Sequence, residues 1–479
     1  MTIDTQLASS VRRPGSFHRF VFANFGRGLV PLDLRMACVG MMTTAGSATA
    51  EVVYEVGDDA DADAKFGPGS ELALMLRKAF AQARLQGASP QIYAVGLTPP
   101  GAGTAQVNTL TFTGPATEDG NFVLRVAGRT ITVGVTNGDA NTDVAAALED
   151  LLDALTTTLP ITAGVAGAVV TCTNVHKGEN GGDVDYEVVE TPSGIACVIA
   201  SSATGSGVTD ITNALDALLG LNIDVVAIAN RKSADVTDSK ANTATAWGAG
   251  EKKYRWVVIG DPTTLSAANT LSTAANDKTV IIASYEGSPS LPGEIAAAVA
   301  CYAWAKERPN ANYDGGVLDL YPPAVASVYT TTEIESALAV GTTPLKPTPG
   351  RDQTEIVRLV TTKTVTSSSP DFVLFDLATS RTAAYMARQI EAAYVSQFVQ
   401  EVMVVDDDSP DNVLDRIRDS VVGVHRAMES LGFIRDVDDF LGEIVVEEAE
   451  DPSGRVNVNN PFRVVSPLHQ AAFVHTAYL

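Results

Sequence analysis

The sequence predicts an α/β core, with a mostly parallel sheet and flanking helices, plus an inserted mainly-β domain and an α+β C-terminal domain with extended terminal arms. Three observations lead to this prediction. Apolar runs alternate with helical patterns in residues 26–100 and again in residues 209–370. Residues 101–208, between them, carry mostly short strand patterns. Two long amphipathic helical patterns follow residue 371.

The first part of the core predicts a strand, a helix and a second strand. The apolar run at 35–41 is expected to be a buried strand. A helix is expected at 70–87, because Ser70 can cap its start, Gly87 can end it and apolar residues recur along one face. Another strand is expected at 91–95. This order is typical of α/β proteins.

The second part of the core repeats the alternation. A short helix is expected at 211–219, ended by Gly220, and a longer one at 292–306. The segments after Gly220 contain near-continuous apolar runs. Such runs are typical of a parallel sheet that helices cover on both faces. The strands expected from these runs are 223–229, 254–260 and 279–285.

Residues 101–208 differ in character from the core on either side. The string FVLRVAGRTITV predicts a hairpin, and AVVTCTNV, VDYEVV and IACVIA predict short strands. One helix is expected at about 142–155. The segment holds twelve acidic and three basic residues, and Gly-, Ser- and Thr-rich stretches flank it. We interpret it as a domain inserted at a loop, where an addition disturbs the host core least.

Residues 371–479 predict the α+β domain. The string DFVLFDLAT is expected to form a strand that leads into a helix at 380–403, where apolar residues recur every four positions. A second helix is expected at 411–431, because Ser409-Pro410 supplies a cap and a first-turn proline. An acidic strand region, GEIVVEEAEDPSGR, and a final stretch at about 455–479 close the chain.

Both chain ends are expected to be extended arms. Residues 1–25 and the final stretch contain short aromatic or β-branched segments beyond any obvious core. Ordered alone, they would expose apolar surface and lose roughly 1–2 kcal/mol of backbone entropy per residue. They therefore need a partner, which is either a neighbouring subunit or a strand of their own domain. The candidate contact residues are Phe17, Phe20, Phe22, Val456, Val458, Phe473, Val474 and Tyr478.

The charge distribution argues against nucleic acid as a direct partner. The formal net charge is −24, whereas binding to phosphate backbones needs clustered Lys and Arg. Residues 1–30 hold four Arg and one Asp, and residues 455–479 hold two Arg and no acidic residue. Basic ends on an acidic body favour docking of the ends of one subunit on its neighbour.

Neither a membrane span nor a secretory signal is expected. Apolar stretches such as 295–305 are far shorter than the roughly 18 residues that a spanning helix needs. The string MTIDTQLASSVRRPGSF lacks the charged and then apolar order of a secretory signal. The protein is therefore expected to be made and retained in a cytoplasm. Its four cysteines form no CxxC pair and are expected to be buried free thiols.

No catalytic, cofactor or metal site is expected. The string at 248–252, the nearest to a P-loop, has neither its spacing nor the Ser or Thr after Lys. The sequence has no GxSxG elbow, and its five histidines form no HExxH pair. One alternative stays open, namely an α/β enzyme or ligand-binding protein with a site at the carboxyl ends of the strands, near Asn230 and Asp261.

Four strings in the C-terminal part of the chain carry a family resemblance. They are IVRLVTTKT (356–364), DFVLFDLATSRTAAYMARQI (371–390), RAMESLGFIRDVDDF (426–440) and IVVEEAEDPSGRVNVNNPFRVVSPLHQAAFVHTAYL (444–479). With FGPGSELALMLRKAF (66–80) upstream, this series resembles contractile phage tail sheath proteins, particularly the Mu-like branch. The resemblance covers the C-terminal quarter of the chain and pieces of the core.

The resemblance implies a structural protein and not an enzyme. It implies a helical homopolymer of stacked rings that surrounds an inner tail tube protein and contracts to drive the tube through a target cell envelope. Baseplate and tail terminator proteins are further implied partners, and the implied location is the virion tail, assembled in the host bacterial cytoplasm. The terminal arms would add strands to sheets of neighbouring subunits, and residues 101–208 would face outward.

The helix expected at 411–431 is the candidate for the face toward an inner tail tube. Its polar side mixes charges of both signs, which suits a protein partner. An ordinary solvated helix face is the alternative. The residues on this side are Asp415, Arg418, Asp419, His425, Arg426 and Glu429.

Overall fold

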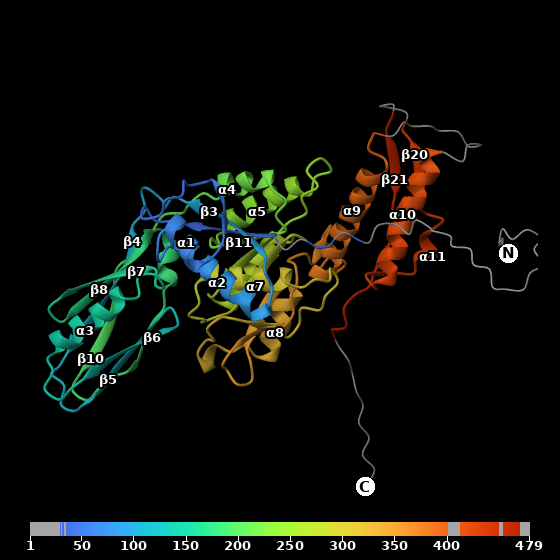
Figure 1. The fold of residues 1–479 in the computed structure, drawn as a ribbon. Coiled ribbons are helices and arrows are strands. Elements are labelled where there is room, and N and C mark those ends of the chain that lie inside the picture. Colours follow the sequence, from blue (N-terminus) through green and yellow to red (C-terminus); the bar gives the residue numbers. More distant parts are fainter. Residues whose placement is uncertain (1–28, 30, 33–34, 401–411, 450–453, 470–479) are drawn as a thin grey trace, which may run out of the picture. The chain divides into compact units, whose positions relative to one another are not determined.

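The computed structural model describes residue 29 and residues 31–32, 35–400, 412–449 and 454–469 (Figure 1). The chain divides into two compact units. The core unit comprises Leu32–Tyr385 and Val465–Leu479, and the second unit comprises Met1–Pro31 and Met386–Val464. The described part of each unit has its own buried apolar clusters.

A nine-stranded mixed sheet forms the centre of the core unit. Its six inner strands run parallel to one another, and antiparallel strands complete both edges. The fold is therefore mixed α/β, with a large sheet as expected. In spatial order the strands are β14 (Val317–Leu318), β16 (Thr354–Ile356), β15 (Thr342–Pro347), β13 (Val280–Ser284), β12 (Trp256–Asp261), β11 (Val225–Ile228), β1 (Arg35–Met41), β3 (Gln91–Leu97) and β2 (Val53–Val56).

Helices cover both faces of this sheet, which makes three layers (Figure 1). On one face lie α2 (Glu71–Gln86) and α7 (Pro292–Trp304), and α1 (Asp59–Phe66) packs on α2. The other face carries α4 (Thr212–Ala217), α5 (Ser233–Ala246) and α6 (Leu265–Ala275), and α8 (Thr331–Ala339) lies beside α6. Alternate residues of β1, β3, β11, β12 and β13 therefore enter different apolar clusters, as the pleat of a buried strand requires.

Local sequence signals explain the best predicted elements. Strand β1 has the bounds expected of it, and α2 begins after Ser70, whose hydroxyl accepts a hydrogen bond from the Ala73 amide. It ends at Gly87, whose φ of 64° is left-handed and therefore suits glycine. Strands β11 and β13 and helix α7 lie within the segments predicted for them, and β12 runs one residue beyond its predicted end, to Asp261.

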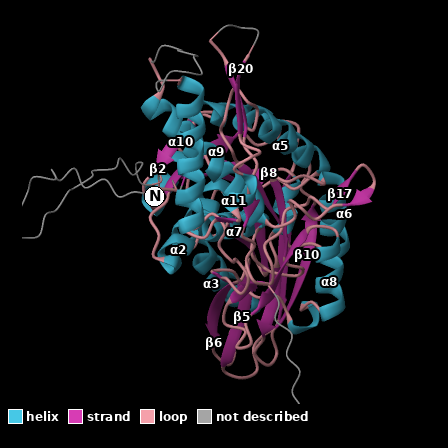
Figure 2. Ribbon diagram, turned by 90° about the vertical axis from the view of Figure 1, so that its right-hand side faces the viewer, coloured by secondary structure: helices cyan, strands magenta, loops and turns pink. Residues whose placement is uncertain are grey.

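Residues 105–203 form two small antiparallel sheets and one helix in the core unit. The first sheet has the order β10-β4-β8-β7 and the second the order β6-β5-β9, and strands of both are labelled in Figure 2. Their buried side chains form one apolar cluster, which also includes Leu74 of α2 and Leu291. The elements are β4 (Ala105–Thr113), β5 (Gly120–Val126), β6 (Arg129–Val135), α3 (Asn141–Asp153), β7 (Ile161–Ala166), β8 (Val169–Lys177), η1 (Glu179–Asp183), β9 (Tyr186–Glu190) and β10 (Ala196–Ala203).

The second unit is built around an antiparallel hairpin and an amphipathic helix. Helix α9 (Leu377–Gln397) contains the division between the units. Phe398, Val413 and Ile417 form a buried cluster in this unit, against which Val446 and Val456 pack. The remaining elements are α10 (Val413–Ser430), β19 (Ile434–Arg435), α11 (Val437–Phe440), β20 (Val445–Glu448), β21 (Val456–Asn459) and β22 (Arg463–Val464).

The strand predicted for DFVLFDLAT is wrong. After the hairpin of β17 (Val365–Thr366) and β18 (Ser369–Pro370), the chain turns, and α9 begins at Leu377. The Asp371 carboxylate accepts a hydrogen bond from the Val373 amide at 3.0 Å, and the Phe375 amide donates to the Phe372 carbonyl at 3.3 Å. These local bonds limit the pairing of this segment to an isolated antiparallel bridge between Val360 and Asp376, because aspartate readily hydrogen-bonds the backbone two residues on.

Candidate assembly surfaces

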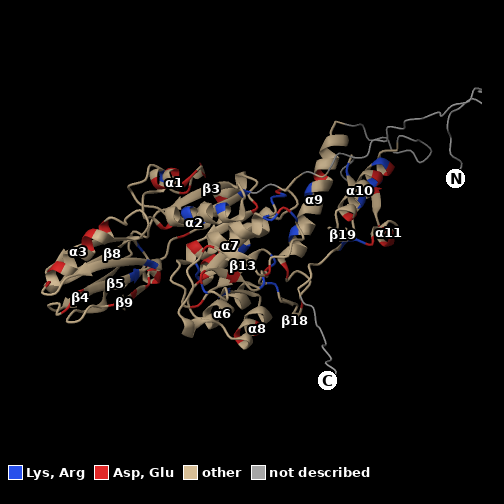
Figure 3. Cartoon of the chain, turned by 60° about the horizontal axis from the view of Figure 1, so that its bottom comes forward, with Lys and Arg blue, Asp and Glu red and all other residues tan. Residues whose placement is uncertain are grey.

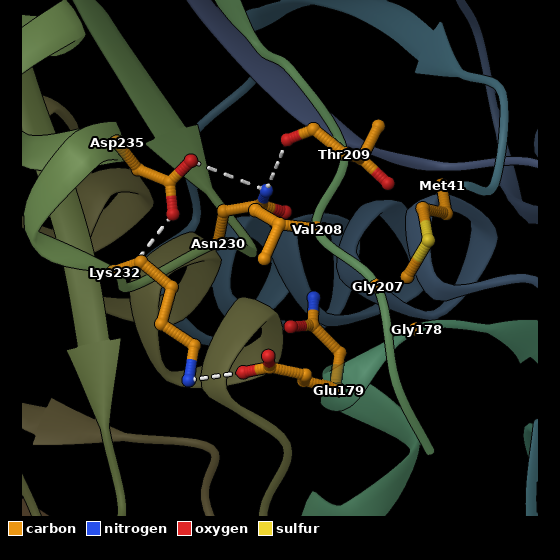
Figure 4. Close-up of a pocket in the computed structure, with 10 residues that line it drawn as sticks. Met41, Gly178, Glu179, Gly207, Val208, Thr209, Asn230, Lys232 and Asp235 are labelled. Atoms are coloured by element: carbon orange, nitrogen blue, oxygen red, sulfur yellow. Dashed lines mark hydrogen bonds and ion pairs between the residues drawn. The ribbon is translucent and has the colours of Figure 1, made fainter. Parts of the chain in front are cut away.

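The carboxyl ends of the parallel strands are the place where an α/β fold most often binds a ligand. Met41 ends β1, Asn230 follows β11 and Asp261 ends β12. The Asn230 side-chain amide donates to the Thr209 carbonyl at 3.1 Å and to the Asp235 carboxylate at 3.4 Å (Figure 4). The Asp261 carboxylate accepts bonds from the Thr263 amide at 2.9 Å and hydroxyl at 2.5 Å. Both predicted residues thus have partners within the chain.

Residues 176–183 lie against this edge and engage it through charged groups. We call the contacts between them and the sheet edge the seam. Arg231 forms a two-armed ion pair with Asp183, with 2.6 Å between Nη2 and Oδ1, and its Nε lies 3.7 Å from Oδ1 of Asp261. Lys232 pairs with Glu179 (Figure 4). The seam therefore occupies the edge that the alternative function would need.

Glu71, at the start of α2, makes the second group of contacts in the seam. Its carboxylate accepts bonds from the Met41 amide at 2.9 Å and the Asn180 side chain at 2.8 Å, and burial raises its pKa. Its own amide donates to Nε2 of His176 at 3.0 Å, so that nitrogen carries no proton. Burial lowers the pKa of His176 to about 4. A neutral imidazole is therefore part of the folded seam.

The space left beside Asn230 is small. The pocket lined by Met41, Gly178, Asn230, Lys232 and Asp235, among others, has a volume of about 10 Å³, which is about the space of one water molecule. Among the described residues, no group of three or more His, Cys, Asp or Glu side chains could hold a metal ion. No helix in the described part of the chain is long and apolar enough to cross a membrane.

The His176 contribution to stability is expected to be complete above about pH 6.5 and to be lost as the pH falls toward 4. Between these values the unfolded chain binds a proton that the folded seam does not, so stability decreases with acidity. The loss is on the order of 2–3 kcal/mol. Thermal midpoints measured from pH 7 to 4 should converge between the parent and His176→Gln, whose amide oxygen can accept from Glu71. Parallel curves for the two proteins would contradict this.

Helix α10 presents most, but not all, of its predicted polar side to solvent, and charges of both signs lie along it (Figure 3). Asp415 and Asp419 are exposed. Arg418 is exposed and donates to the carbonyls of Leu441 and Ile444 at 3.0 and 3.3 Å. His425, in contrast, is buried and lies 2.5 Å from the side-chain oxygen of Asn460. An imidazole in that position is unable to contribute to an exposed face.

The last turn of α10 uses its charges within the second unit. Arg426 pairs with Glu429 at 3.1 Å and with Asp438. The Glu429 carboxylate also accepts a bond from the Val437 amide at 3.0 Å, which fixes the start of α11. Arg426 and Glu429 therefore stabilise the second unit itself, besides any contact with a partner.

The predicted arm residues are only partly within the described residues. Val456 and Val458 lie on β21, which pairs with β20, and Val456 packs against the apolar cluster of the second unit. Val458 is 41% exposed. The others lie outside the described residues, namely Phe17, Phe20, Phe22, Phe473, Val474 and Tyr478.

The start of α9 is fixed to the core by residues of the string that carries the family resemblance. Ser380 accepts a bond from the indole of Trp256 at 3.2 Å. Arg381 is 2% exposed, and its guanidinium donates to the carbonyls of Ala303 and Lys306, both at 2.9 Å. The sequence singled out this string, but it gave no indication that Arg381 closes the end of α7.

Comparisons with known proteins agree with these features. No family model matches the chain. A Mu-like prophage FluMu tail sheath protein of Haemophilus influenzae is 24% identical over 440 residues, which cover 88% of each protein. A sheath tail protein from Listeria innocua shares the fold with a TM-score of 0.53 at 13% identity, covering 92% of this chain and 94% of that one.

The baseplate of the anti-feeding prophage supplies a further structural neighbour. One of its chains has a TM-score of 0.50 at 12% identity, covering 98% of this chain and 100% of that chain. The resemblance predicted from the C-terminal strings is therefore confirmed. This chain is a homologue of a Mu-like prophage tail sheath protein over most of its length, and its homologues support a viral structural role in a contractile tail sheath.

Proposed function

We propose that this chain is the sheath subunit of a contractile tail, and that copies of it polymerise as a helical tube of stacked rings around an inner tail tube. Contraction of the polymer drives the tube through the envelope of a target cell. The observation that carries the proposal is the homology to a tail sheath protein over 88% of the chain, which includes both units. The filled space beside Asn230 weighs against a ligand site at that position.

Polymerisation requires contacts between different surfaces of identical subunits, which extend without closing. Contraction is then a switch between two packings of rigid parts, driven by the free energy stored in the lattice at assembly. The two compact units are suitable rigid parts, because each has its own apolar clusters. Baseplate and tail terminator proteins would bind the ends of the tube, in the host cytoplasm first and in the virion tail afterwards.

Strands β20 and β21 are the candidate acceptor for the terminal arm of a neighbour. Among the described residues they form a sheet of two strands only, and a two-stranded sheet is marginal on its own. Each main-chain bond to an added strand contributes about 0.5–1.5 kcal/mol net. Glu447 and Glu448 are exposed on β20, and the first 30 residues hold four Arg and one Asp. Opposite charge thus favours this pairing.

The exposed side of α10 is the candidate for the contact with the inner tube. Asp415, Asp419 and Arg418 are exposed there. A surface with both signs of charge orients a charged partner without holding it tightly. Such a contact suits a tube that the sheath must release during contraction.

Removal of residues 1–25 is expected to abolish tube formation. Negative-stain microscopy of the full-length chain should show long striated tubes, whereas the truncated chain should give separate particles. Replacing Phe17, Phe20 and Phe22 with serine should have the same effect. Leu85→Ser is the matched control, since Leu85 is an exposed apolar residue of the core, 45% exposed. Uniform particles from both the full-length and the truncated chain would contradict the proposal and favour a ligand-binding role.

A further inference from the structure

After entering the core unit between Pro31 and Leu32, the chain crosses between the two units at two further described places. It leaves the core unit within α9 and returns between Val464 and Val465. Residues 465–469, which we call the strap, have no regular secondary structure. They lie against residues 305–316, the loop after α7, which we call the hub loop. Both segments belong to the core unit.

Alternate side chains of the hub loop hold the strap. The Asn310 side-chain amide donates to the Val465 carbonyl at 3.2 Å, and the Asn312 side-chain amide donates to the Leu468 carbonyl at 2.9 Å. Two residues further on, the Asp314 carboxylate lies 2.7 Å from Nδ1 of His469. Asn312 is itself oriented, because its side-chain oxygen accepts a bond from the Asp314 amide at 2.9 Å. Asn310, Asn312 and Asp314 are two positions apart, as expected when side chains of an extended segment point to the same side.

The hub loop also holds the start of α9. Tyr313 accepts a bond from the guanidinium of Arg381 at 2.7 Å through its hydroxyl. Asp376, directly before α9, lies 3.5 Å from Nε2 of His469 and is fixed by Arg358 at 2.8 Å. The departing helix and the returning strap are therefore held at one place in the core unit.

The two attachments differ in strength. Arg381 is 2% exposed and reaches three acceptors, so the start of α9 is deeply fixed. The strap shows little apolar burial, since Leu468 is 77% exposed and Ser466 is exposed. Its described polar contacts are made by side chains and not by the ladder of a sheet. Side-chain contacts of this kind break and re-form one by one, whereas a buried guanidinium leaves several acceptors unpaired at once.

We propose that the strap is a releasable latch. When Asn310, Asn312 and Asp314 bind the strap, the hub loop holds two segments at once. These are the start of α9, where the chain leaves the core unit, and the strap, where it returns. Release of the strap leaves the deeply fixed start of α9 in place while the return path moves. The proposal concerns the single chain and does not depend on the proposed sheath function.

The latch can be tested with a spin label on the strap of the full-length chain. Ser466 is exposed, so Ser466→Cys can carry the label in a Cys197→Ser background, where Cys38, Cys172 and Cys301 are buried. Asn312→Asp keeps the shape of the side chain but replaces the donor to Leu468 with an acceptor. His469→Ala changes the strap alone and leaves the hub loop intact. In the double variant we expect the ratio of mobile to immobile label to rise about tenfold.

Asn459→Asp is the matched control. Asn459 also donates to a backbone carbonyl, that of Glu443 at 2.9 Å, but in the second unit. The Asn459→Asp substitution should leave the spectrum of the spin label on the strap unchanged. Thermal unfolding of each variant establishes that the core remains folded. A label that is already mobile in the parent, or one that stays immobile in folded Asn312→Asp/His469→Ala protein, would overturn the latch. Because no tube is needed, this result is separate from the test of sheath function.

Discussion

Arg231→Ala is expected to destabilise the core unit by about 3–5 kcal/mol, the usual cost of removing one partner from a buried ion pair. The guanidinium lies between two carboxylates whose side chains are 9% exposed in Asp183 and 1% exposed in Asp261. Without it, like charges face each other where water is scarce. The measurement is the thermal midpoint of unfolding, which should fall by several degrees. Arg231 connects residues 176–183 to the sheet edge.

The pH dependence of this loss distinguishes charge from packing. Burial raises the pKa of Asp183, and removal of Arg231 takes away the nearby positive charge that opposes this rise. A carboxyl group whose folded pKa is raised makes the protein more stable as the pH falls. The deficit of Arg231→Ala should therefore shrink from pH 7 to pH 5, and Asp183→Asn should partly rescue the variant. A deficit that is independent of pH would indicate lost packing alone.

Arg125→Ala is the matched control for the charge argument. Arg125 pairs with Glu187 at 2.6 Å within residues 105–203, but the two side chains are 38% and 51% exposed. Exposed ion pairs contribute about 0–1 kcal/mol. An effect of Arg125→Ala as large as that of Arg231→Ala would show that burial is not the deciding factor.

The sequence predicted best those elements that carry their own start and stop signals. Helix α2 is an example, because its cap, its apolar stripe and its terminal glycine are all local. Helix α5 was missed for the opposite reason. Its sequence SADVTDSKANTATA is rich in residues with low helix propensity. Its buried side chains include Asp235, Ser239 and Asn242, so no apolar stripe marks it. Tertiary hydrogen bonds, such as that from Asn242 to Asp216 at 3.1 Å, hold it.

The seam and the strap could not be predicted from the sequence. Asp183 and Arg231 are 48 residues apart, and Glu71 and His176 are 105 apart. No periodicity joins such residues, since they meet only when the sheet has ordered its strands. The sequence did place Asn230 and Asp261 at the ends of strands, as found. What it could not indicate is that another part of the same chain fills the space beside them.

Arg381→Ala is expected to cost the core unit about 3–5 kcal/mol, comparable with the effect of Arg231→Ala but for a different reason. The guanidinium lies at the end of α7, where the last carbonyl groups of a helix have no partner within the helix and its dipole is negative. Its loss leaves the carbonyls of Ala303 and Lys306 and the hydroxyl of Tyr313 without this donor, and opens a cavity beside Trp304.

Two further variants separate the charge of Arg381 from its geometry. Arg381→Lys keeps the positive charge but lacks the planar fork that reaches three acceptors, so it should recover only part of the loss. Arg84→Ala is the control, because Arg84 also lies in the last turn of a helix, α2, but its side chain is 65% exposed. It should cost at most about 1 kcal/mol. If thermal unfolding gave Arg381→Lys the stability of the parent, charge at the helix end would suffice. A full loss in Arg381→Lys would instead assign the anchor of α9 to the shape of the guanidinium.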